Sequence, residues 1–189
     1  MSEKRVTILM GSPHRDGNTA ALADRIAEGA REAGAEADVL YLHGMKILPC
    51  TACEACHKPG AEGCILDDEM DEVYANLRSA DAIVFASPIY FFTMSAQLKT
   101  ALDRCYALVS PTGENALEGK RVGLAFGYGA ADPFDSGCAN AVRTFQDACH
   151  FGNLDLVGVV HGSVSGGGLR ADAAVMDAAA DLGRRLAAD

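Results

Sequence analysis

The sequence is short of two things: positive charge and long apolar runs. Only 16 Lys and Arg stand against 26 Asp and Glu, which gives a net charge of −10. A surface of that sign repels phosphates, so we expect neither a nucleic-acid partner nor binding to an anionic membrane. No apolar run approaches the roughly 18 residues that cross a bilayer. The first apolar run, Val6 to Met10, is too short for a signal-peptide core. We therefore expect a cytoplasmic protein with reduced thiols, in which a disulfide framework is improbable.

The chain has 189 residues, of which 49% are apolar, enough for one domain (1–189) with its own core. Short apolar, β-rich runs alternate with longer segments of helical periodicity. The predicted strands are Arg5–Met10, Ala37–Leu42, Ala82–Ser87, Arg121–Phe126 and Leu154–Val160. The helical segments carry apolar stripes at Leu22/Ile26/Ala30, Met70/Val73/Leu77, Leu98/Leu102/Cys105/Val109, Cys138/Val142/Phe145/Cys149 and Val175/Ala179/Leu182/Leu186.

Five successive β–α units predict an α/β fold with helices on both faces of a parallel sheet. For five strands we expect the doubly wound, flavodoxin-like order 2-1-3-4-5. Ligands of such sheets bind at the carboxyl ends of the strands, near the point where the strand order reverses. The loops after the first, third and fourth strands are therefore the candidate binding loops.

The loop after the first strand offers the parts of a phosphate site. It lacks both GxGxxG and the Walker pattern, which argues against a dinucleotide fold and a P-loop NTPase. It supplies hydroxyls from Ser12 and Thr19, the amide of Asn18 and the cation of Arg15, at the start of a helix. Helix N-termini favour anions because their free N–H groups and dipole face the ligand. The alternative is an ordinary helix cap.

The loop after the third strand contains Pro88, Ile89, Tyr90 and Phe91, a set of side chains suited to contact a flat ring. The alternative is that these aromatic rings simply pack beneath the loop. After the fourth strand, Gly127 permits close approach of the backbone to a ligand and Tyr128 is placed to cover a ring. A tight turn explains this last pair equally well.

Four of the seven cysteines fall within a loop at about residues 48–66, next to the predicted binding edge. Cys50, Cys53, Cys56 and Cys64 have the spacing C-x2-C-x2-C-x7-C. Four closely spaced thiolates suit a [4Fe–4S] cluster. Zinc also takes four cysteines, although its structural sites usually space them as two separated pairs. Free structural or reactive thiols remain the third interpretation. The other cysteines, Cys105, Cys138 and Cys149, lie on apolar helix stripes, where burial is expected.

Two runs, GSPHRDGNTAAL and SPIYFFTMSAQLKTALDR, resemble the flavodoxin-like NAD(P)H-dependent FMN reductases. The cysteine spacing resembles that of the iron–sulfur flavoprotein branch of the family. The resemblance implies FMN, with Ser12, Arg15, Asn18 and Thr19 around its phosphate. It places Pro88, Ile89, Tyr90 and Phe91 along the isoalloxazine, and Gly127 with Tyr128 on its other side. It also implies that Cys50, Cys53, Cys56 and Cys64 hold the cluster.

The expected function is that of an FMN-dependent redox flavoprotein that passes electrons between FMN and a [4Fe–4S] cluster. Its redox partner would be NAD(P)H or a small electron-carrier protein, and the resemblance implies a homodimer or homotetramer. No side chain is expected to act as a catalytic acid or base. One alternative is a cluster-free NAD(P)H-dependent FMN or quinone reductase. A non-enzymatic signalling module is disfavoured, because Met10-Gly11-Ser12 and Ser87-Pro88 stand where its carboxylates are needed.

Overall fold

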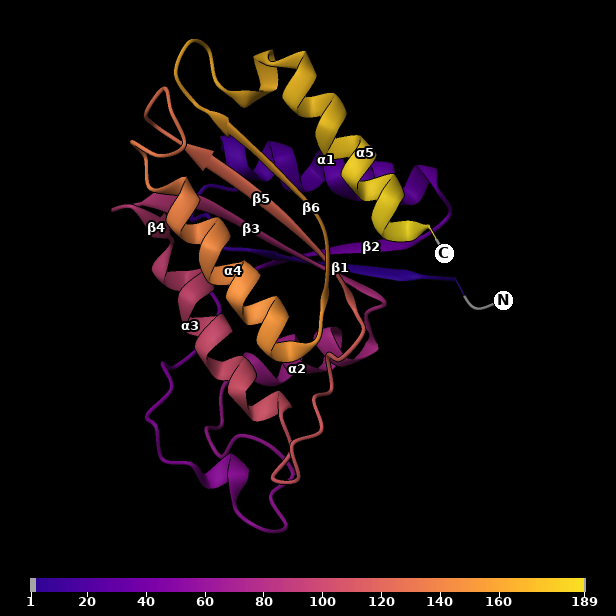
Figure 1. The fold of residues 1–189 in the computed structure, drawn as a ribbon, viewed down its shortest axis with the longest axis vertical. Coiled ribbons are helices and arrows are strands. Elements are labelled where there is room, and N and C mark those ends of the chain that lie inside the picture. The colour runs from indigo at the N-terminus through magenta and orange to yellow at the C-terminus, as the bar shows by residue number, and fades with distance from the viewer. Residues whose placement is uncertain (1–2, 189) are drawn as a thin grey trace.

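The computed structural model describes residues 3–188. The chain forms one sheet with helices on both faces (Figure 1). The elements are β1 (Arg5–Met10), α1 (Asn18–Glu32), β2 (Glu36–Tyr41), η1 (Ala55–His57), α2 (Met70–Ser79), β3 (Ala82–Tyr90), β4 (Thr93–Met94), α3 (Ala96–Arg104), η2 (Cys105–Leu108), β5 (Arg121–Tyr128), α4 (Cys138–Gly152), β6 (Asp155–Ser163), η3 (Leu169–Ala171) and α5 (Ala173–Ala187). Within residues 3–188, no helix combines the length and hydrophobicity needed to cross a membrane.

The sheet order is β2-β1-β3-β5-β6, with every neighbouring pair parallel, and β4 adds a short antiparallel pairing to β3. Counted over the parallel strands alone, this is 2-1-3-4-5, which confirms the predicted flavodoxin-like fold. Successive side chains of a strand point to opposite faces. Accordingly, Leu9 and Phe85 pack in one core cluster with α2, α3 and α4, whereas Ile8 and Val84 pack in the other with α1 and α5.

The helices α1 and α5 touch backbone to backbone. A Cβ built on Gly29 would lie 2.0 Å from the carbonyl oxygen of Ala180, and one on Gly183 would lie 2.0 Å from that of Ile26. Neither position has room for a side chain. The two glycines therefore allow this pair of helices to pack closely on one face of the sheet (Figure 1).

Several details differ from the predicted elements. The strands β5 and β6 continue to Tyr128 and Ser163, so Gly127 and Tyr128 lie at the end of a strand and not in the loop after it. The third strand continues to Tyr90 and turns back into β4 through Phe91 and Phe92, whose φ angles are 46° and 71°. Two-residue hairpins of this geometry normally use Gly or Asn. Because this turn uses two phenylalanines, it could not be predicted from the sequence. The third helix ends at Arg104 and tightens into the 3₁₀ turn η2. Extending its apolar stripe through Cys105 to Val109 was therefore wrong.

Candidate functional site

The carboxyl ends of β1, β3 and β5 bring the three predicted binding loops to one edge of the sheet, here called the flavin edge. The backbone N–H of Gly11 donates to the carbonyl of Ala86 at 2.8 Å, and Pro88 stands opposite Gly127 in the β3–β5 register. The edge lies to the left in Figure 1, where the arrows of β3 and β5 end. The fold thus gathers segments that are more than 100 residues apart in the sequence.

The first loop leaves the N-terminus of α1 open to a ligand. The helix begins after Gly17, and no side chain among the described residues caps it. Ser12 and Thr19 are buried, and the hydroxyl of Ser12 accepts a hydrogen bond from the N–H of His14 at 3.1 Å. The Arg15 guanidinium lies over the ring of Tyr41, 4.3 Å from its centroid. Uncapped N–H groups and the helix dipole together favour an anion here.

Asn18 does not point freely toward a ligand in this structure. Its side-chain oxygen accepts a 2.7 Å hydrogen bond from the N–H of Leu169. A Cβ on Gly168 would lie 2.6 Å from the same oxygen, so the glycine permits this contact. On the neighbouring strand, a Cβ on Gly127 would lie 3.5 Å from the Thr19 hydroxyl. Asn18 therefore fastens the glycine-rich segment 162–168 to the flavin edge, a role that its sequence pattern did not reveal.

The aromatic hairpin between β3 and β4 presents its rings to solvent. Pro88 is buried and Ile89 half-buried, whereas Tyr90 and Phe91 are 45% and 95% exposed. The carbonyl of Phe92 accepts a 3.2 Å hydrogen bond from the Asn140 side chain at the start of α4. The alternative that these rings all pack beneath the loop is thus wrong for Tyr90 and Phe91, whose rings are accessible at the flavin edge.

Two buried serines join this hairpin to the first loop. Ser95 caps α3 by accepting from the N–H of Leu98 at 3.3 Å, and its hydroxyl donates to the carbonyl of Gly11 at 2.8 Å. The hydroxyl of Ser87 accepts from the N–H of Ser95 at 2.9 Å. A Cβ on Gly11 would lie 2.7 Å from the Ser95 hydroxyl, so Gly11 must lack a side chain.

Tyr128 is 5% exposed and packs in the core cluster beneath α4. Its hydroxyl lies 3.1 Å from Nδ1 of His161 on β6. Burial raises the pKa of Tyr128. This conformation leaves the backbone around Gly127, and not the phenol ring, as the part of β5 that lies beside Thr19 at the start of α1.

The cysteine loop lies away from the flavin edge, contrary to its predicted position beside that edge. His57 at its tip stacks on Tyr106 of η2, with ring centroids 4.0 Å apart, and its Nε2 lies 3.1 Å from the Tyr106 carbonyl. The loop therefore packs at the C-terminal end of α3, below the helices in Figure 1. Nine residues of α3 separate this end from the flavin edge, about 13 Å of helix. Twenty-eight residues join β2 to α2, which is long enough for the loop to extend from the flavin edge to the C-terminal end of α3.

The four loop cysteines line one cavity of about 430 Å³, together with Asp103 and Tyr106. All four are free thiols. Within residues 3–188, no three His, Cys, Asp or Glu side chains converge closely enough to hold a single metal ion. The thiols thus surround a common space instead of meeting at one point.

The electrostatic environments of the loop thiols differ. Hydrogen bonding, first from the backbone of Ala55 and then from Thr51, lowers the pKa of Cys53. Burial raises the pKa of Cys56, and the neighbouring thiolates of Cys64, Cys53 and Cys50 add to the effect.

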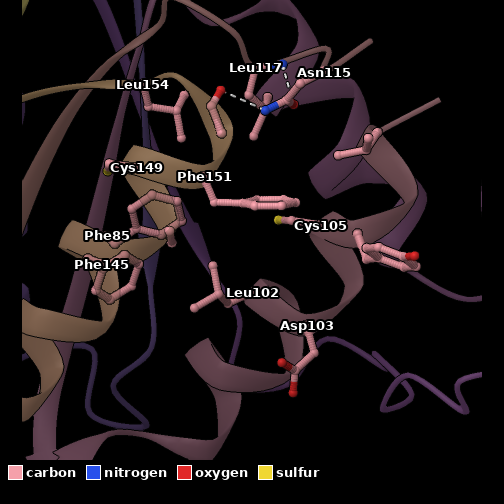
Figure 2. A pocket seen from close by; sticks show the side chains of 14 residues that line it. Phe85, Leu102, Asp103, Cys105, Asn115, Leu117, Phe145, Cys149, Phe151 and Leu154 are labelled. Atoms are coloured by element: carbon pink, nitrogen blue, oxygen red, sulfur yellow. Dashed lines mark hydrogen bonds between the residues drawn. The ribbon is translucent and has the colours of Figure 1, made fainter. Parts of the chain in front are cut away.

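A second, apolar cavity of about 290 Å³ lies between the C-terminal ends of α3 and α4 (Figure 2). Phe85, Phe145 and Leu102 form its walls, and Cys105 and Cys149 also line it. Burial raises the pKa of Cys149 to about 11 and, with the charge of Asp103, that of Cys105 to about 12. Cys138 and Cys149 are buried as predicted, whereas Cys105 is half-buried. This cavity is remote from the flavin edge, and we assign it no part in that site.

Residues 4–183 match the model of the NADPH-dependent FMN reductase family. The chain belongs to this family. It is 31% identical over 154 residues to an iron–sulfur flavoprotein from Methanosarcina thermophila, covering 82% of this chain and 77% of the relative. A second iron–sulfur flavoprotein, from Methanocaldococcus jannaschii, is 36% identical over 139 residues, with 74% and 67% covered.

The fold is also shared with a solved NAD(P)H:quinone oxidoreductase from Methanothermobacter marburgensis. The TM-score is 0.76 at 20% identity, with 100% of this chain and 99% of the other covered. Membership of the FMN reductase family makes the protein a flavin-dependent oxidoreductase. The open N-terminus of α1 and the exposed aromatic hairpin are the features of this chain that fit a flavin phosphate and ring.

Proposed function

We propose that the flavin edge binds FMN. Ser12, Arg15, Thr19 and the backbone N–H of Asn18 surround its phosphate, since the Asn18 side chain is engaged by Leu169. Pro88, Ile89, Tyr90 and Phe91 line the isoalloxazine. The backbone of Gly127 and Tyr128 closes the other side, since the Tyr128 ring is buried. The uncapped N-terminus of α1 supports the phosphate position, since its free N–H groups satisfy an anion. The packing of Gly127 beside Thr19 supports the inclusion of the third loop.

We further propose that Cys50, Cys53, Cys56 and Cys64 hold a [4Fe–4S] cluster. The observation that carries this proposal is the single cavity lined by all four thiols. In a cubane cluster each thiolate binds a different iron, so the sulfurs must surround a space. A lone zinc ion instead needs four sulfurs at about 2.3 Å from one point. The similarity to proteins named iron–sulfur flavoproteins agrees with the cluster.

FMN exchanges electrons singly or in pairs, and a cluster exchanges them singly, so the two together would link a two-electron donor to a one-electron carrier. The chain's own residues bind and orient the groups: α1 fixes the phosphate, and the hairpin offers rings for the flavin to contact. The proposed redox partner is NAD(P)H or a small electron-carrier protein. We also propose a homodimer or homotetramer, supported by the exposed rings of Phe91 and Phe134 and testable by analytical ultracentrifugation.

Anaerobic purification followed by assays of flavin, iron and acid-labile sulfide tests the proposal. We expect one FMN per chain and about four irons with four sulfides. Absence of FMN rejects the whole proposal, whereas FMN without iron rejects only the cluster. Thr19→Val should weaken FMN binding by about tenfold, the size of a lost hydrogen bond to a charged group. Thr144→Val, on the outer part of α4, is the matched control and should bind FMN normally.

The second candidate function is a cluster-free NAD(P)H-dependent FMN or quinone reductase. The exposure of Phe91 and Phe92, 95% and 56%, favours it because open rings offer a stacking surface for a flat acceptor. Steady-state oxidation of NADH or NADPH with quinones distinguishes the two. Replacing Cys53 with serine leaves this rate unchanged if the flavin works alone. A loss of electron transfer to a one-electron acceptor in the same variant supports the cluster.

A further inference from the structure

The two ends of the cysteine loop are joined before the loop departs from the domain. Lys46 and Glu69 pair reciprocally: the Lys46 N–H donates to the Glu69 carboxylate, and the Glu69 N–H donates to the Lys46 carbonyl at 3.2 Å. Two residues further out, the Leu48 N–H donates to Oδ2 of Asp68 at 2.8 Å. Residues 46–48 and 68–69 therefore form a closed loop neck, from which residues 49–67 project.

Arg104, the last residue of α3, binds both sides of this loop neck. Its Nη1 donates to the carbonyl of Leu48 at 2.8 Å and to Oδ2 of Asp68 at 2.7 Å, while Nη2 donates to Oδ1 of Asp68 at 3.2 Å. The side chains of Arg104 and Asp68 are 1% and 3% exposed. A planar guanidinium with several donors is suited to hold a carboxylate and a carbonyl together.

The surrounding groups fix this ion pair in place. The Tyr74 hydroxyl of α2 donates to the Arg104 carbonyl at 2.9 Å, and Oδ1 of Asp68 accepts from the Met70 N–H at 3.0 Å. Burial opposes ionisation of Asp68, but its hydrogen bonds to Arg104 and to the Leu48 and Met70 amides outweigh burial and lower its pKa. Buried ion pairs are weak sources of stability, and fixing one conformation is their better-supported role.

We propose that Arg104 is a positioning residue for the cysteine loop, holding its neck closed so that the four thiols surround one cavity. Leu48, whose carbonyl Arg104 binds, lies two residues before Cys50, and Asp68 lies four residues after Cys64. The guanidinium charge is therefore held beside both ends of the proposed ligand set. This second role rests on the proposed cluster, whereas closure of the neck does not.

Amide hydrogen exchange in the reduced, metal-free protein tests the first role. We compare wild type with Arg104→Met, and with Arg104→Met/Asp68→Asn in case the single variant leaves too costly a buried carboxylate to fold. The Leu48 and Met70 amides should exchange at least tenfold faster in either variant. Arg78→Met is the matched control, because it removes an exposed cation near the same loop, and it should retain wild-type exchange. Wild-type protection in a folded Arg104 variant overturns the proposal, whatever the protein's metal content.

The midpoint potential of the iron-loaded protein tests the electrostatic effect of Arg104 on the proposed cluster. A nearby cation favours the more negative, reduced cluster, so Arg104→Met should shift the potential downward and Asp68→Asn should shift it upward. Simple loosening of the loop moves both variants in the same direction, and that outcome overturns the electrostatic role. Arg104→Lys retains the charge and should lie closer to wild type than Arg104→Met. A wild-type protein that takes up no iron rejects the proposed cluster, and the exchange experiment still decides the role of Arg104 in closing the neck.

Discussion

Asp68 is a buried carboxylate whose ionised form is held by hydrogen bonds, and this gives the fold a defined dependence on acid. Its pKa is lowered in the folded protein, while an unfolded aspartate titrates near 3.9. The stability it contributes is therefore complete above about pH 4 and is lost as the pH falls through the lower, folded pKa. We expect the unfolding free energy of wild type to decrease below about pH 4 more steeply than that of Arg104→Met/Asp68→Asn. Urea unfolding between pH 2 and 6 measures both slopes, and equal slopes contradict the assignment.

The seven cysteines span the range of burial, with Cys56, Cys64 and Cys105 half-buried between two extremes. Cys138 and Cys149 are buried, and burial raises the pKa of each to about 11, so both remain protonated and inert near pH 8. Cys50 and Cys53 are exposed. In the reduced, metal-free protein at pH 8, iodoacetamide should modify Cys50 and Cys53 at least tenfold faster than the two buried thiols, as followed by peptide mass spectrometry. In urea the difference should disappear; labelling of native Cys149 at the rate of Cys50 contradicts this grouping.

At the scale of elements, the turn of the β3–β4 hairpin opposes the conformational preferences of its two phenylalanines. Phe91 adopts a left-handed conformation, which costs a non-glycine residue about 1–2 kcal/mol. Its side chain is 95% exposed, so its removal sacrifices almost no burial. Because the added flexibility of glycine costs only about 0.5–1 kcal/mol, Phe91→Gly should raise the unfolding free energy by about 0.5–1 kcal/mol.

Phe134 offers the matched control for the hairpin. It is 78% exposed but does not adopt a positive φ, so Phe134→Gly gains no relief and should lose about 0.5–1 kcal/mol. Urea unfolding compares the two variants. A stability loss in Phe91→Gly shows that the ring contributes packing that outweighs the strain. A fall in FMN affinity in the same variant supports the proposed contact between this ring and the flavin.

At the scale of the whole molecule, the contact between α1 and α5 sets the packing of two helices against the helix propensity of their glycines. Alanine is favoured over glycine inside a helix by about 1 kcal/mol. At Gly29, however, a Cβ would lie 2.0 Å from the Ala180 carbonyl oxygen, so the helices must separate. We expect Gly29→Ala to lower the unfolding free energy by about 1–3 kcal/mol, the range for overpacked cores. Gly129→Ala, where nothing lies within 4 Å, is the control for thermal unfolding. A stabilised Gly29→Ala contradicts the backbone contact.

Apolar runs and helical periodicity predicted the alternation of strands and helices, because buried strands such as β1 carry continuous apolar runs. The strand order followed from the usual topology of five-stranded doubly wound sheets. The same patterns placed Ser12, Pro88 and Gly127 on one edge, since parallel strands end together. Three features could not be predicted from the sequence: the Phe91–Phe92 turn, the contact of Asn18 with the segment 162–168, and the distance of the cysteine loop from the flavin edge. The first two depend on tertiary contacts that override local preference, and the third depends on the path of a long loop. Tertiary contacts and loop paths leave no periodic pattern in a sequence.

The closed loop neck has a consequence for how such a chain can change. Because the Leu48 N–H meets the Asp68 carboxylate at 2.8 Å, residues 49–67 leave the domain and return at nearly the same place. None of these residues belongs to the sheet. The loop is therefore a removable module: a short turn can span the same gap and leave a flavodoxin-like core intact. Gain or loss of this one insertion would add or remove all four proposed cluster ligands at once, without any change to the strands that form the flavin edge.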